Sequence, residues 1–184
     1  MKIEQTPLPG VLILEPRVFS DQRGFFMETY QAQRYAEAGL PRLFVQDNLS
    51  FSSRGTLRGL HFQHPHDQGK LVQVLQGEVF DVAVDIRQGS TTFGRWFGTY
   101  LSGDNKRQLY VPVGFAHGFC VTSDTALLAY KCTDYYNAAA EAGIAWNDPD
   151  IAIDWPVSDP TLSDKDAAAP RLRDVEPGRL PRVE

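Results

Sequence analysis

The chain has 184 residues, of which 42% are hydrophobic and 22% are charged, and its formal net charge is -5. This composition is typical of one globular domain, expected to span residues 1–184, and argues against wholesale disorder. The negative balance argues against nucleic-acid binding, because such proteins normally carry a basic surface.

Further features bear on location. No apolar run reaches the ~18 residues that a membrane-spanning helix needs, and the first 15 residues show no signal-peptide pattern. Cys120 and Cys132 lie in apolar strand-like runs, where we expect buried free thiols rather than a disulfide. We therefore expect a cytoplasmic protein that acts without a membrane or nucleic-acid partner.

The N-terminal part contains a strand, a turn and a helix. The apolar run at 11–14 is bracketed by prolines and predicts a strand. Asp21 and Gly24 mark a turn. Residues 29–38 predict a short helix that ends at Gly39, because glycine favours helix C-termini.

From residue 43 the sequence alternates as β-strands do. In residues 78–86 one face is fully apolar, whereas the other mixes Val79 and Ala83 with Asp81 and Asp85, which is typical of a barrel with polar side chains inside. Turn signals separate the runs at spacings that favour an antiparallel barrel or double sheet. The predicted strands are 43–50, 56–63, 70–76, 78–86, 92–101, 108–113, 116–122 and 126–133.

The C-terminal part has a different composition. From Asn147 onward Asp and Pro increase, so we expect loops and one short helical turn near 163–169. The tail at 172–184 is expected to be weakly ordered unless it docks on the body of the protein.

His61 and Lys70 are the first candidate functional residues. His61 lies in a strand-like run three residues after Arg58, and Lys70 begins the next run. If strands 57–62 and 70–76 are neighbours, both side chains can point into one cavity.

The motif Pro-x-Gly-x-x-His at 112–117 looks like the second motif of the cupin superfamily, in which the histidine points into a small barrel. His64 and His66 resemble the first motif, but Lys70 stands where metal-binding members have a glutamate. A cation there would repel a divalent metal ion, so we expect no metal site.

Two tyrosines and an aspartate complete the candidate set. Tyr130 and Tyr136 share a strand face because their separation is even. A phenol can act as a general acid, and a tyrosine ring can stack on a base. Asp166 is a candidate carboxylate to orient a histidine base.

Seven motifs in order resemble the dTDP-4-dehydrorhamnose 3,5-epimerase family over about residues 5–170. They are Asp21-Gln-Arg-Gly-Phe-Phe-Met-Glu28, Val45-Gln-Asp-Asn48, Leu57-Arg-Gly-Leu-His-Phe-Gln63, Gly69-Lys-Leu-Val72, Pro112-Val-Gly-Phe-Ala-His-Gly-Phe119, Tyr130-Lys-Cys-Thr-Asp-Tyr-Tyr136 and Leu162-Ser-Asp-Lys-Asp166.

The resemblance implies a mainly β, cupin-type jelly-roll barrel with a short N-terminal helix and a loop-rich C-terminal tail. It implies a homodimer that works without metal or cofactor. The implied substrate is dTDP-4-dehydro-6-deoxy-glucose, inverted at C3 and C5 for dTDP-L-rhamnose synthesis.

The resemblance also implies residue roles. His61 matches the base, Asp166 its orienting partner, Lys70 the cation that stabilises the enolate and Tyr130 the acid on the opposite face. Arg23 and Arg58 suit diphosphate oxygens, and Tyr136 matches the ring that stacks on thymine. The positions matching substrate contacts are Arg23, Glu28, Gln46, Asp47, Asn48, Arg58, Lys70, His117, Tyr136, Glu141 and Lys165. The segment between Tyr136 and Glu141 lacks the proline expected there.

Three alternatives stay open at this point. The nearest is a 3- or 5-mono-epimerase of another deoxysugar pathway, which shares the histidine, lysine and tyrosine. A metal-dependent cupin would use His64, His66 and His117. A sugar-binding cupin without catalysis would keep the arginines but need no base.

Overall fold

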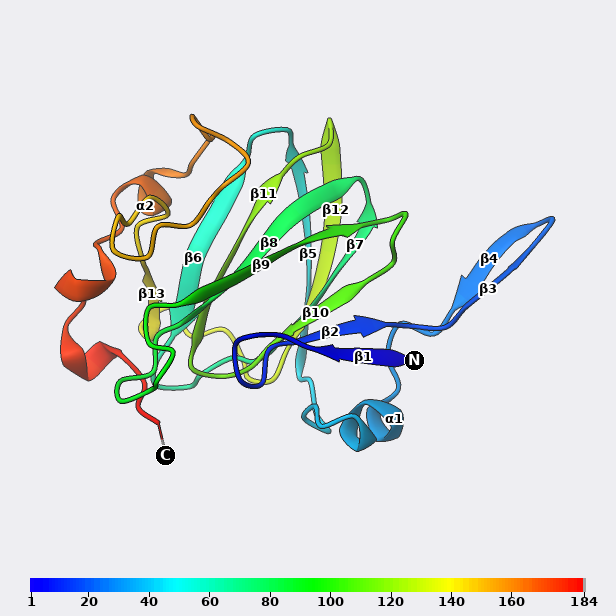
Figure 1. Ribbon diagram of the computed structural model, residues 1–184, viewed down its shortest axis with the longest axis horizontal. Helices are drawn as coiled ribbons and strands as arrows, with labels where there is room; N and C mark the ends of the chain where they lie inside the picture. Colours follow the sequence, from blue (N-terminus) through cyan, green and yellow to red (C-terminus); the bar gives the residue numbers. More distant parts are fainter. Residues whose placement is uncertain (184) are drawn as a thin grey trace.

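Two antiparallel sheets face each other in the computed structural model, which describes residues 1–183 (Figure 1). The six-stranded sheet contains, in spatial order, β1 (Lys2–Gln5), β2 (Leu12–Glu15), β10 (Gln108–Val111), β7 (Lys70–Gln76), β12 (Thr125–Cys132) and β5 (Gln46–Ser53). The five-stranded sheet contains β13 (Glu141–Gly143), β6 (Leu57–Gln63), β11 (Phe115–Val121), β8 (Glu78–Asp85) and β9 (Trp96–Ser102). The mainly β prediction is confirmed.

The alternation in β8 places its two faces in different environments. Val79 and Ala83 belong to the core between the sheets, together with residues of β7, β10, β11 and β12. Phe80 and Val82 face the other way, into a second core under the C-terminal segments. Burying each such valine contributes roughly 1.5–3 kcal/mol. The apolar face therefore lies outside the barrel, and the mixed face lines its interior.

The C-terminal segments cover the outer face of the five-stranded sheet. They include α2 (Asp164–Ala167), which lies within the predicted helical turn, and two 3-10 turns, η1 (Leu172–Asp174) and η2 (Pro177–Arg179). Leu172 and Leu180 are buried in the second core, and the Asp148 carboxylate accepts the Leu172 N–H at 2.8 Å. The tail is thus docked through residue 183. Glu184, the last residue of the tail predicted to be weakly ordered, lies outside the described residues.

Helix α1 (Ala32–Glu37) is shorter than the predicted helix 29–38. The Gln31 side chain accepts the Arg34 N–H at 2.6 Å and so caps the helix three residues later than expected. Thr29 stays outside it, and its carbonyl accepts the Gln108 amide N–H at 2.7 Å. Buried Tyr35 anchors α1 to the outer face of the six-stranded sheet by donating to Gln108 at 2.8 Å.

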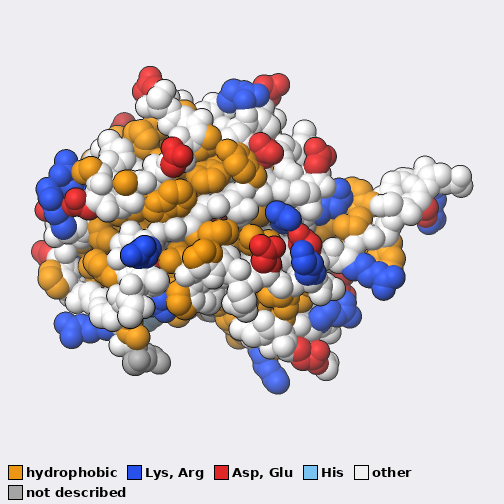
Figure 2. Space-filling model, viewed as in Figure 1, with side chains coloured by type: hydrophobic (Ala, Val, Ile, Leu, Met, Phe, Trp, Pro, Cys, Tyr) orange, Lys and Arg blue, Asp and Glu red, His pale blue; other side chains and the backbone are white. Residues whose placement is uncertain are grey.

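Strands β3 (Val18–Asp21) and β4 (Gly24–Met27) form a hairpin, here called the arm, that projects away from the barrel (Figure 1). Its turn is the one predicted at Asp21 and Gly24, although its strands were not predicted. Three phenylalanines on it are half or more exposed: Phe19, Phe25 and Phe26. Figure 2 shows apolar side chains at the base of this projection and in a band across the barrel.

Several strand boundaries differ from the predicted ones. β5 runs from Gln46 to Ser53 rather than over 43–50, so the following turn begins only at Arg54. β9 begins at Trp96 rather than at 92, because Ser90 and Thr92 turn back to donate to the Asp85 carboxylate, both at 2.6 Å. Cys120 and Cys132 are buried and free, as predicted.

Within residues 1–183, no helix has the length and apolar character needed to cross a membrane.

Candidate active site

His61 and Lys70 lie on opposite walls of the barrel. The conditional prediction that their strands are neighbours is wrong, because β6 belongs to the five-stranded sheet and β7 to the six-stranded sheet. The loop 64–69 crosses from one sheet to the other. His61 pairs in register with His117 of β11 and shares its inward face. Lys70 shares the inward face of Val72 and Val74, which belong to the core between the sheets.

A glycine brings β6 close to β11 just before His61. Gly59 has a φ of +118°, which favours glycine. A Cβ at this position would lie 2.6 Å from Gly118 Cα and 2.7 Å from the His117 carbonyl oxygen. The Arg-Gly-Leu-His motif thus has a local structural reason: only glycine permits this approach of the two strands.

Asp166 reaches His61 from the far end of the chain. Its Oδ1 lies 2.5 Å from His61 Nε2, and the carboxylate is buried. Ser163 caps α2 by accepting the Asp166 N–H at 3.1 Å, which fixes Asp166 at the first turn. Burial acts to raise the pKa of Asp166, but hydrogen bonds from His61, Ser163 and the Gly59 backbone hold it below its ordinary value. The carboxylate therefore stays ionised beside the imidazole.

Lys70 lies beside Cys132 on the neighbouring strand β12, and Gln46 of β5 follows in the same row. Burial lowers the pKa of the Lys70 ammonium, while the negative charges of Asp81 and Glu141 act in the opposite direction. A partly buried cation in this place can stabilise negative charge on a bound molecule better than a fully exposed one.

Tyr130 occupies the next row inward on the same wall, between Val72 and Asn48. Lys70 and Tyr130 are thus diagonal neighbours on adjacent strands, about 7–8 Å apart at Cα. Burial raises the pKa of the Tyr130 phenol, and the Arg58 charge acts to lower it. A phenol that keeps its proton is suited to donate it.

His117 forms a second buried histidine–carboxylate pair inside the barrel. Its Nε2 lies 2.8 Å from Asp81 Oδ1, and both side chains are almost fully buried. His64, in contrast, bonds to Asp67 within the loop 64–69 at 2.8 Å. Across residues 1–183, no three His, Cys, Asp or Glu side chains gather in a way that could hold a metal ion. The three histidines of the metal-cupin alternative therefore do not converge.

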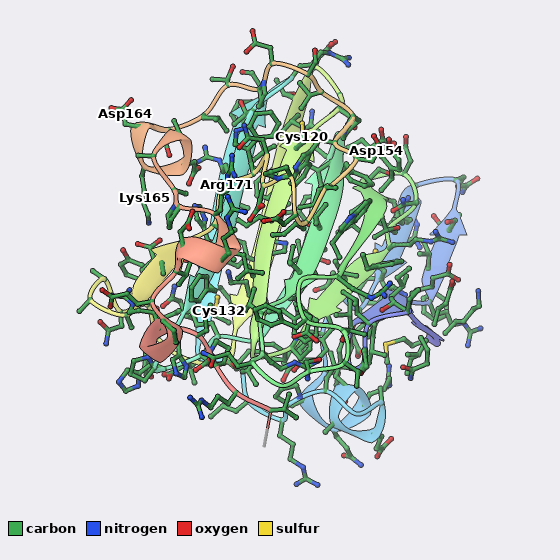
Figure 3. The ribbon with its side chains drawn as sticks, turned by 60° about the vertical axis from the view of Figure 1, so that its left-hand side comes forward. Cys120, Cys132, Asp154, Asp164, Lys165 and Arg171 are labelled. Atoms are coloured by element: carbon green, nitrogen blue, oxygen red, sulfur yellow. The ribbon has the colours of Figure 1, made fainter. Side chains whose placement is uncertain are left out.

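The mouth of the barrel carries a chain of polar contacts centred on Glu141. Its carboxylate lies 2.5 Å from Lys165 Nζ and accepts the Tyr136 hydroxyl at 2.8 Å. Figure 3 shows Lys165 on α2, next to β13. Burial acts to raise the pKa of Glu141, but Lys165 and Tyr136 hold it below its ordinary value. In the segment that lacks the expected proline, the Asn137 side chain accepts the Ala139 N–H at 3.0 Å and so closes the turn.

Arg58, Gln46 and Asn48 also line the interior or its mouth. Arg58 Nε donates to Ser52 on β5 at 3.0 Å, and Gln46 donates to Asn48 at 3.1 Å. The predicted residues that the fold brings together are therefore His61, Asp166, Lys70, Tyr130, His117, Arg58, Gln46, Asn48, Tyr136, Glu141 and Lys165.

Three predicted contact residues lie elsewhere in the chain's own fold. Arg23 on the arm bonds to Asp21, with Nη2 and Oδ2 2.5 Å apart. Glu28 bonds to Arg34 of α1 at 2.6 Å. Asp47 bonds to Lys131 at 2.9 Å on the outer face of the six-stranded sheet. None of them reaches the interior from these positions.

The sequence analysis did not identify Asp81 as the partner of His117, or Ser163 as the residue that caps the helix carrying Asp166. The signal for Asp81 is its position on the mixed face of its strand, which the alternation predicts and the structure confirms. Ser163 stands three residues before Asp166, which is the spacing of a helix N-cap.

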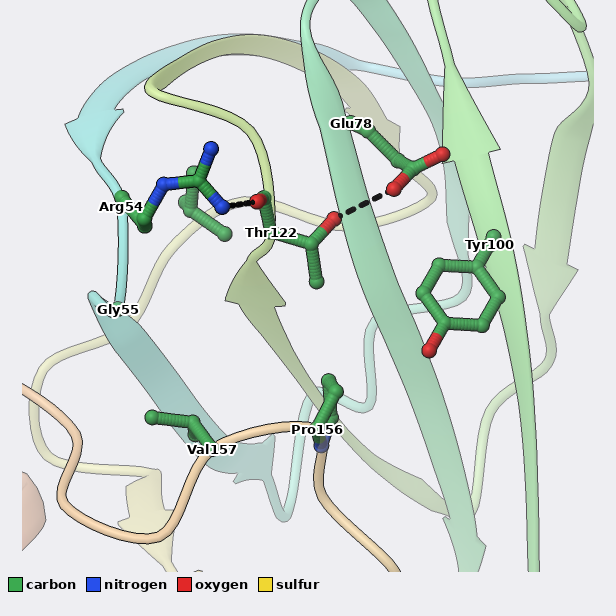
Figure 4. A pocket seen from close by; sticks show the side chains of 8 residues that line it. Arg54, Gly55, Glu78, Tyr100, Thr122, Pro156 and Val157 are labelled. Atoms are coloured by element: carbon green, nitrogen blue, oxygen red, sulfur yellow. Dashed lines mark hydrogen bonds between the residues drawn. The ribbon is translucent and has the colours of Figure 1, made fainter.

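A separate cavity of about 580 Å³ lies at the opposite end of the barrel, among the turns that follow β5, β7 and β11 (Figure 4). Arg54 and Glu78 both face it but are occupied: Arg54 donates to the Thr122 carbonyl, and Glu78 accepts the Thr122 hydroxyl at 2.8 Å. None of the predicted site residues lines this cavity.

Known proteins match the chain over almost its whole length. The family model described as dTDP-4-dehydrorhamnose 3,5-epimerase matches residues 5–174. The dTDP-4-dehydrorhamnose 3,5-epimerase of Shigella flexneri is 54% identical over 178 residues, which cover 96% of this chain and 98% of the relative.

Solved structures of epimerases also resemble this chain. The dTDP-6-deoxy-D-glucose-3,5-epimerase RmlC from Legionella pneumophila Philadelphia 1, in complex with dTDP-4-keto-L-rhamnose, has a TM-score of 0.97 and 55% identity and covers 100% of this chain and 98% of its own. ChmJ, a 3'-monoepimerase from Streptomyces bikiniensis in complex with dTDP-quinovose, has a TM-score of 0.90 and 36% identity. The match covers 97% of this chain and 93% of the ChmJ chain.

The fold and these similarities define a cupin-type epimerase, which confirms the predicted barrel and the predicted enzyme class. The chain belongs to the dTDP-4-dehydrorhamnose 3,5-epimerase family.

Proposed function

We propose that this protein converts dTDP-4-dehydro-6-deoxy-D-glucose to dTDP-4-dehydro-L-rhamnose, in dTDP-L-rhamnose synthesis, within one domain of residues 1–184. The observation that carries the proposal is the arrangement of the interior. A histidine paired to an ionised carboxylate faces, across the barrel, a partly buried lysine and a partly buried tyrosine. Family membership supplies the substrate class.

The proposed base is the free nitrogen of His61. With Nε2–H donating to Asp166, the lone pair lies on Nδ1, which takes the proton from a carbon next to the C4 ketone. The electron pair moves into an enolate whose oxygen is stabilised by the Lys70 ammonium. Asp166 stabilises the imidazolium that forms.

Tyr130 then returns a proton to the same carbon from the opposite face, which inverts it. The C4 carbonyl re-forms, and Tyr130 and His61 exchange protons with solvent before the second carbon reacts. The ketone itself accepts the electron pair, so the proposed steps balance with these side chains and need no cofactor. His117 contacts the sugar, while Arg58 and Lys165 face the diphosphate.

A 3- or 5-mono-epimerase is the second candidate, because a structure that resembles the chain at a TM-score of 0.90 is a 3'-monoepimerase. The two candidates differ in how many carbons exchange protons with solvent. We expect the product formed in deuterated water to carry deuterium at both C3 and C5, as read by NMR. Label at a single carbon would replace the double epimerase with a mono-epimerase.

We further propose that the protein is a homodimer in which each arm completes the partner's site. Arg23 and Glu28 match substrate contacts but lie on or beside the projecting arm, away from the site of their own chain (Figure 1). Strand β5 forms an unpaired edge of the six-stranded sheet and exposes Leu49 and Phe51. An exposed apolar edge of this kind favours association with another chain.

Sedimentation tests the dimer. The chain has a mass of 20.6 kDa, so we expect a species of twice that mass at micromolar concentration. The variant Phe51→Glu should sediment as a monomer and lose turnover, whereas a control with Phe93→Glu, on an exposed site of the β8–β9 loop, should keep both. A monomeric wild type with full activity would overturn this part of the proposal. Asp47 lies on the same outer face as Leu49, away from the interior of its own chain. In a monomer it could therefore not contact the substrate as the resemblance implies.

A further inference from the structure

Gln63 is a buried amide at the end of β6, two residues after His61. Its side chain is only 5% exposed. The even separation places it on the same strand face as His61. A buried amide is costly unless its donors and acceptor are bonded, so its partners indicate what it does.

The Gln63 amide is bonded on every side to the backbone of two loops at the barrel mouth. Its Nε2 donates to the Tyr135 carbonyl at 3.1 Å and to the His66 carbonyl. Its Oε1 accepts the Asn137 N–H at 2.8 Å. One side chain thus connects the loop 64–69 to the loop that follows β12.

A second glutamine holds the residue in between. Gln46, on the opposite sheet, accepts the Tyr136 N–H at 2.8 Å. Tyr135, Tyr136 and Asn137 are therefore held in sequence by two amides, one from each wall of the barrel. Tyr136 itself is exposed, and its hydroxyl bonds to Glu141. Its ring direction depends on this held backbone.

We propose that Gln63 is a positioning residue that aligns Tyr136 with His61. With the nucleobase stacked on Tyr136 in this position, the sugar of the same molecule reaches His61. This inference rests on the proposed function, in which Tyr136 stacks on thymine. Gln63 and His61 both lie on β6, and the Gln63 amide bonds to Tyr135 and Asn137 on either side of Tyr136. The position of Tyr136 relative to His61 therefore depends on these bonds. Loss of this alignment should weaken nucleotide binding, and therefore raise the KM, more than it slows the reaction of a substrate that is already bound.

The test uses Gln63→Met, which keeps the length but removes all three bonds. We expect the Kd for dTDP, measured by calorimetry, and the KM to rise about 10- to 100-fold, with kcat falling less than about threefold. Inhibition by pyrophosphate, which has no base to stack, should change less than about threefold. Gln63→Glu keeps the acceptor and the shape but sets an oxygen against two carbonyls, and it serves if Gln63→Met does not fold.

Gln88→Met is the matched control. Gln88 also donates to two backbone carbonyls, of Pro177 and Leu180, but it anchors the C-terminal tail instead of the mouth. It should lower the Tm without changing the Kd for dTDP.

A double-mutant cycle separates positioning from general stabilisation. In a Tyr136→Ala background, Gln63→Met should have little further effect on the Kd, because the ring it positions is absent. Additive effects, or equal changes in Kd for the Gln63 and Gln88 variants, would overturn the inference. If the wild type failed to bind dTDP or to epimerise, the proposed function itself would be wrong, which is a different result.

Discussion

The barrel interior and the projecting arm hold their charged residues in opposite ways. In the interior, His61 bonds to a carboxylate 105 residues away and His117 to one 36 residues away, and both carboxylates are buried. On the arm, Arg23 bonds to a residue only two positions away, and both side chains are exposed. The buried pairs fix the two histidines against carboxylates from distant parts of the chain, whereas the exposed pair on the arm joins only neighbouring residues.

The largest effect is expected from breaking the interior. His61→Ala removes the proposed base, so turnover should fall by about 10³-fold or more, while the Kd for dTDP stays within about threefold of wild type. His64→Ala is the control, because the side chain of this histidine bonds to Asp67 within the loop 64–69. Product formation by NMR and dTDP binding by calorimetry are the measurements. A variant that lost binding and turnover equally would make His61 a substrate-holding residue.

The arm is expected to show a smaller effect that depends on the partner. Arg23→Ala should raise the KM by about 10- to 100-fold, as for a lost contact to diphosphate. If the arm acts on the partner's site, a mixture of His61→Ala and Arg23→Ala chains should regain activity. Half of the dimers are then mixed and each holds one intact site, so about a quarter of wild-type activity is expected at low substrate concentration.

The same mixture can refute the exchange. If each arm served its own chain, no site of a mixed dimer would contain both an intact His61 and an intact Arg23, and activity would stay at the level of the unmixed variants. The mixture should be unfolded and refolded together so that the chains exchange, and sedimentation should confirm the dimers.

The smallest effect is expected on the free energy of unfolding, from the buried carboxylate of Asp85. Burial acts to raise the pKa of Asp85, but hydrogen bonds from Arg87, Ser90 and Thr92 outweigh it and lower the pKa to about 2. An unfolded aspartate has a pKa of ~3.9, so the lowered value contributes about 2 kcal/mol above that pH. This contribution is lost as the pH falls through the folded value of about 2.

Asp85→Asn should therefore lower the free energy of unfolding by about 2 kcal/mol at pH 7 and by less near pH 2. Urea unfolding followed by circular dichroism at several pH values measures this. The arm variant Asp21→Asn, which breaks an exposed pair, should leave the Tm unchanged. Asp85 and Asp21 each pair with an arginine two residues away, so the two variants compare a buried pair with an exposed one. Equal losses would contradict an effect of burial.

The parts of the site that could be predicted from sequence are those carried by short motifs. Strand periodicity placed Asp81 and Asp85 on a mixed inner face. The prediction that Tyr130 and Tyr136 share a strand face is wrong, because β12 ends at Cys132 and Tyr136 lies in the loop that follows it. The turn at Asp21 and Gly24 was also visible, since glycine is needed where the chain reverses. These features depend on residues a few positions apart.

Other features could not be predicted in the same way. Helix α1 begins later than predicted because the Gln31 side chain accepts the Arg34 N–H. Glutamine is not among the residues that usually cap helices, so the sequence did not indicate this start. β3 and β4 were missed because exposed phenylalanines beside charged residues do not alternate as a half-buried strand does. The tail docks because Leu172 and Leu180 find an apolar sheet face that no local pattern describes.

By itself, the sequence of this protein determined the β character of the chain, the family and the residue types that the reaction needs, because all of these are written in local periodicity and motifs. Only the tertiary structure decided that His61 and Lys70 face each other from different sheets, that Asp166 reaches His61 through a capped turn of helix, and that Gln63 connects two loops at the mouth. The physical reason is that strand pairing across sheets depends on contacts between distant segments, which no window of sequence contains.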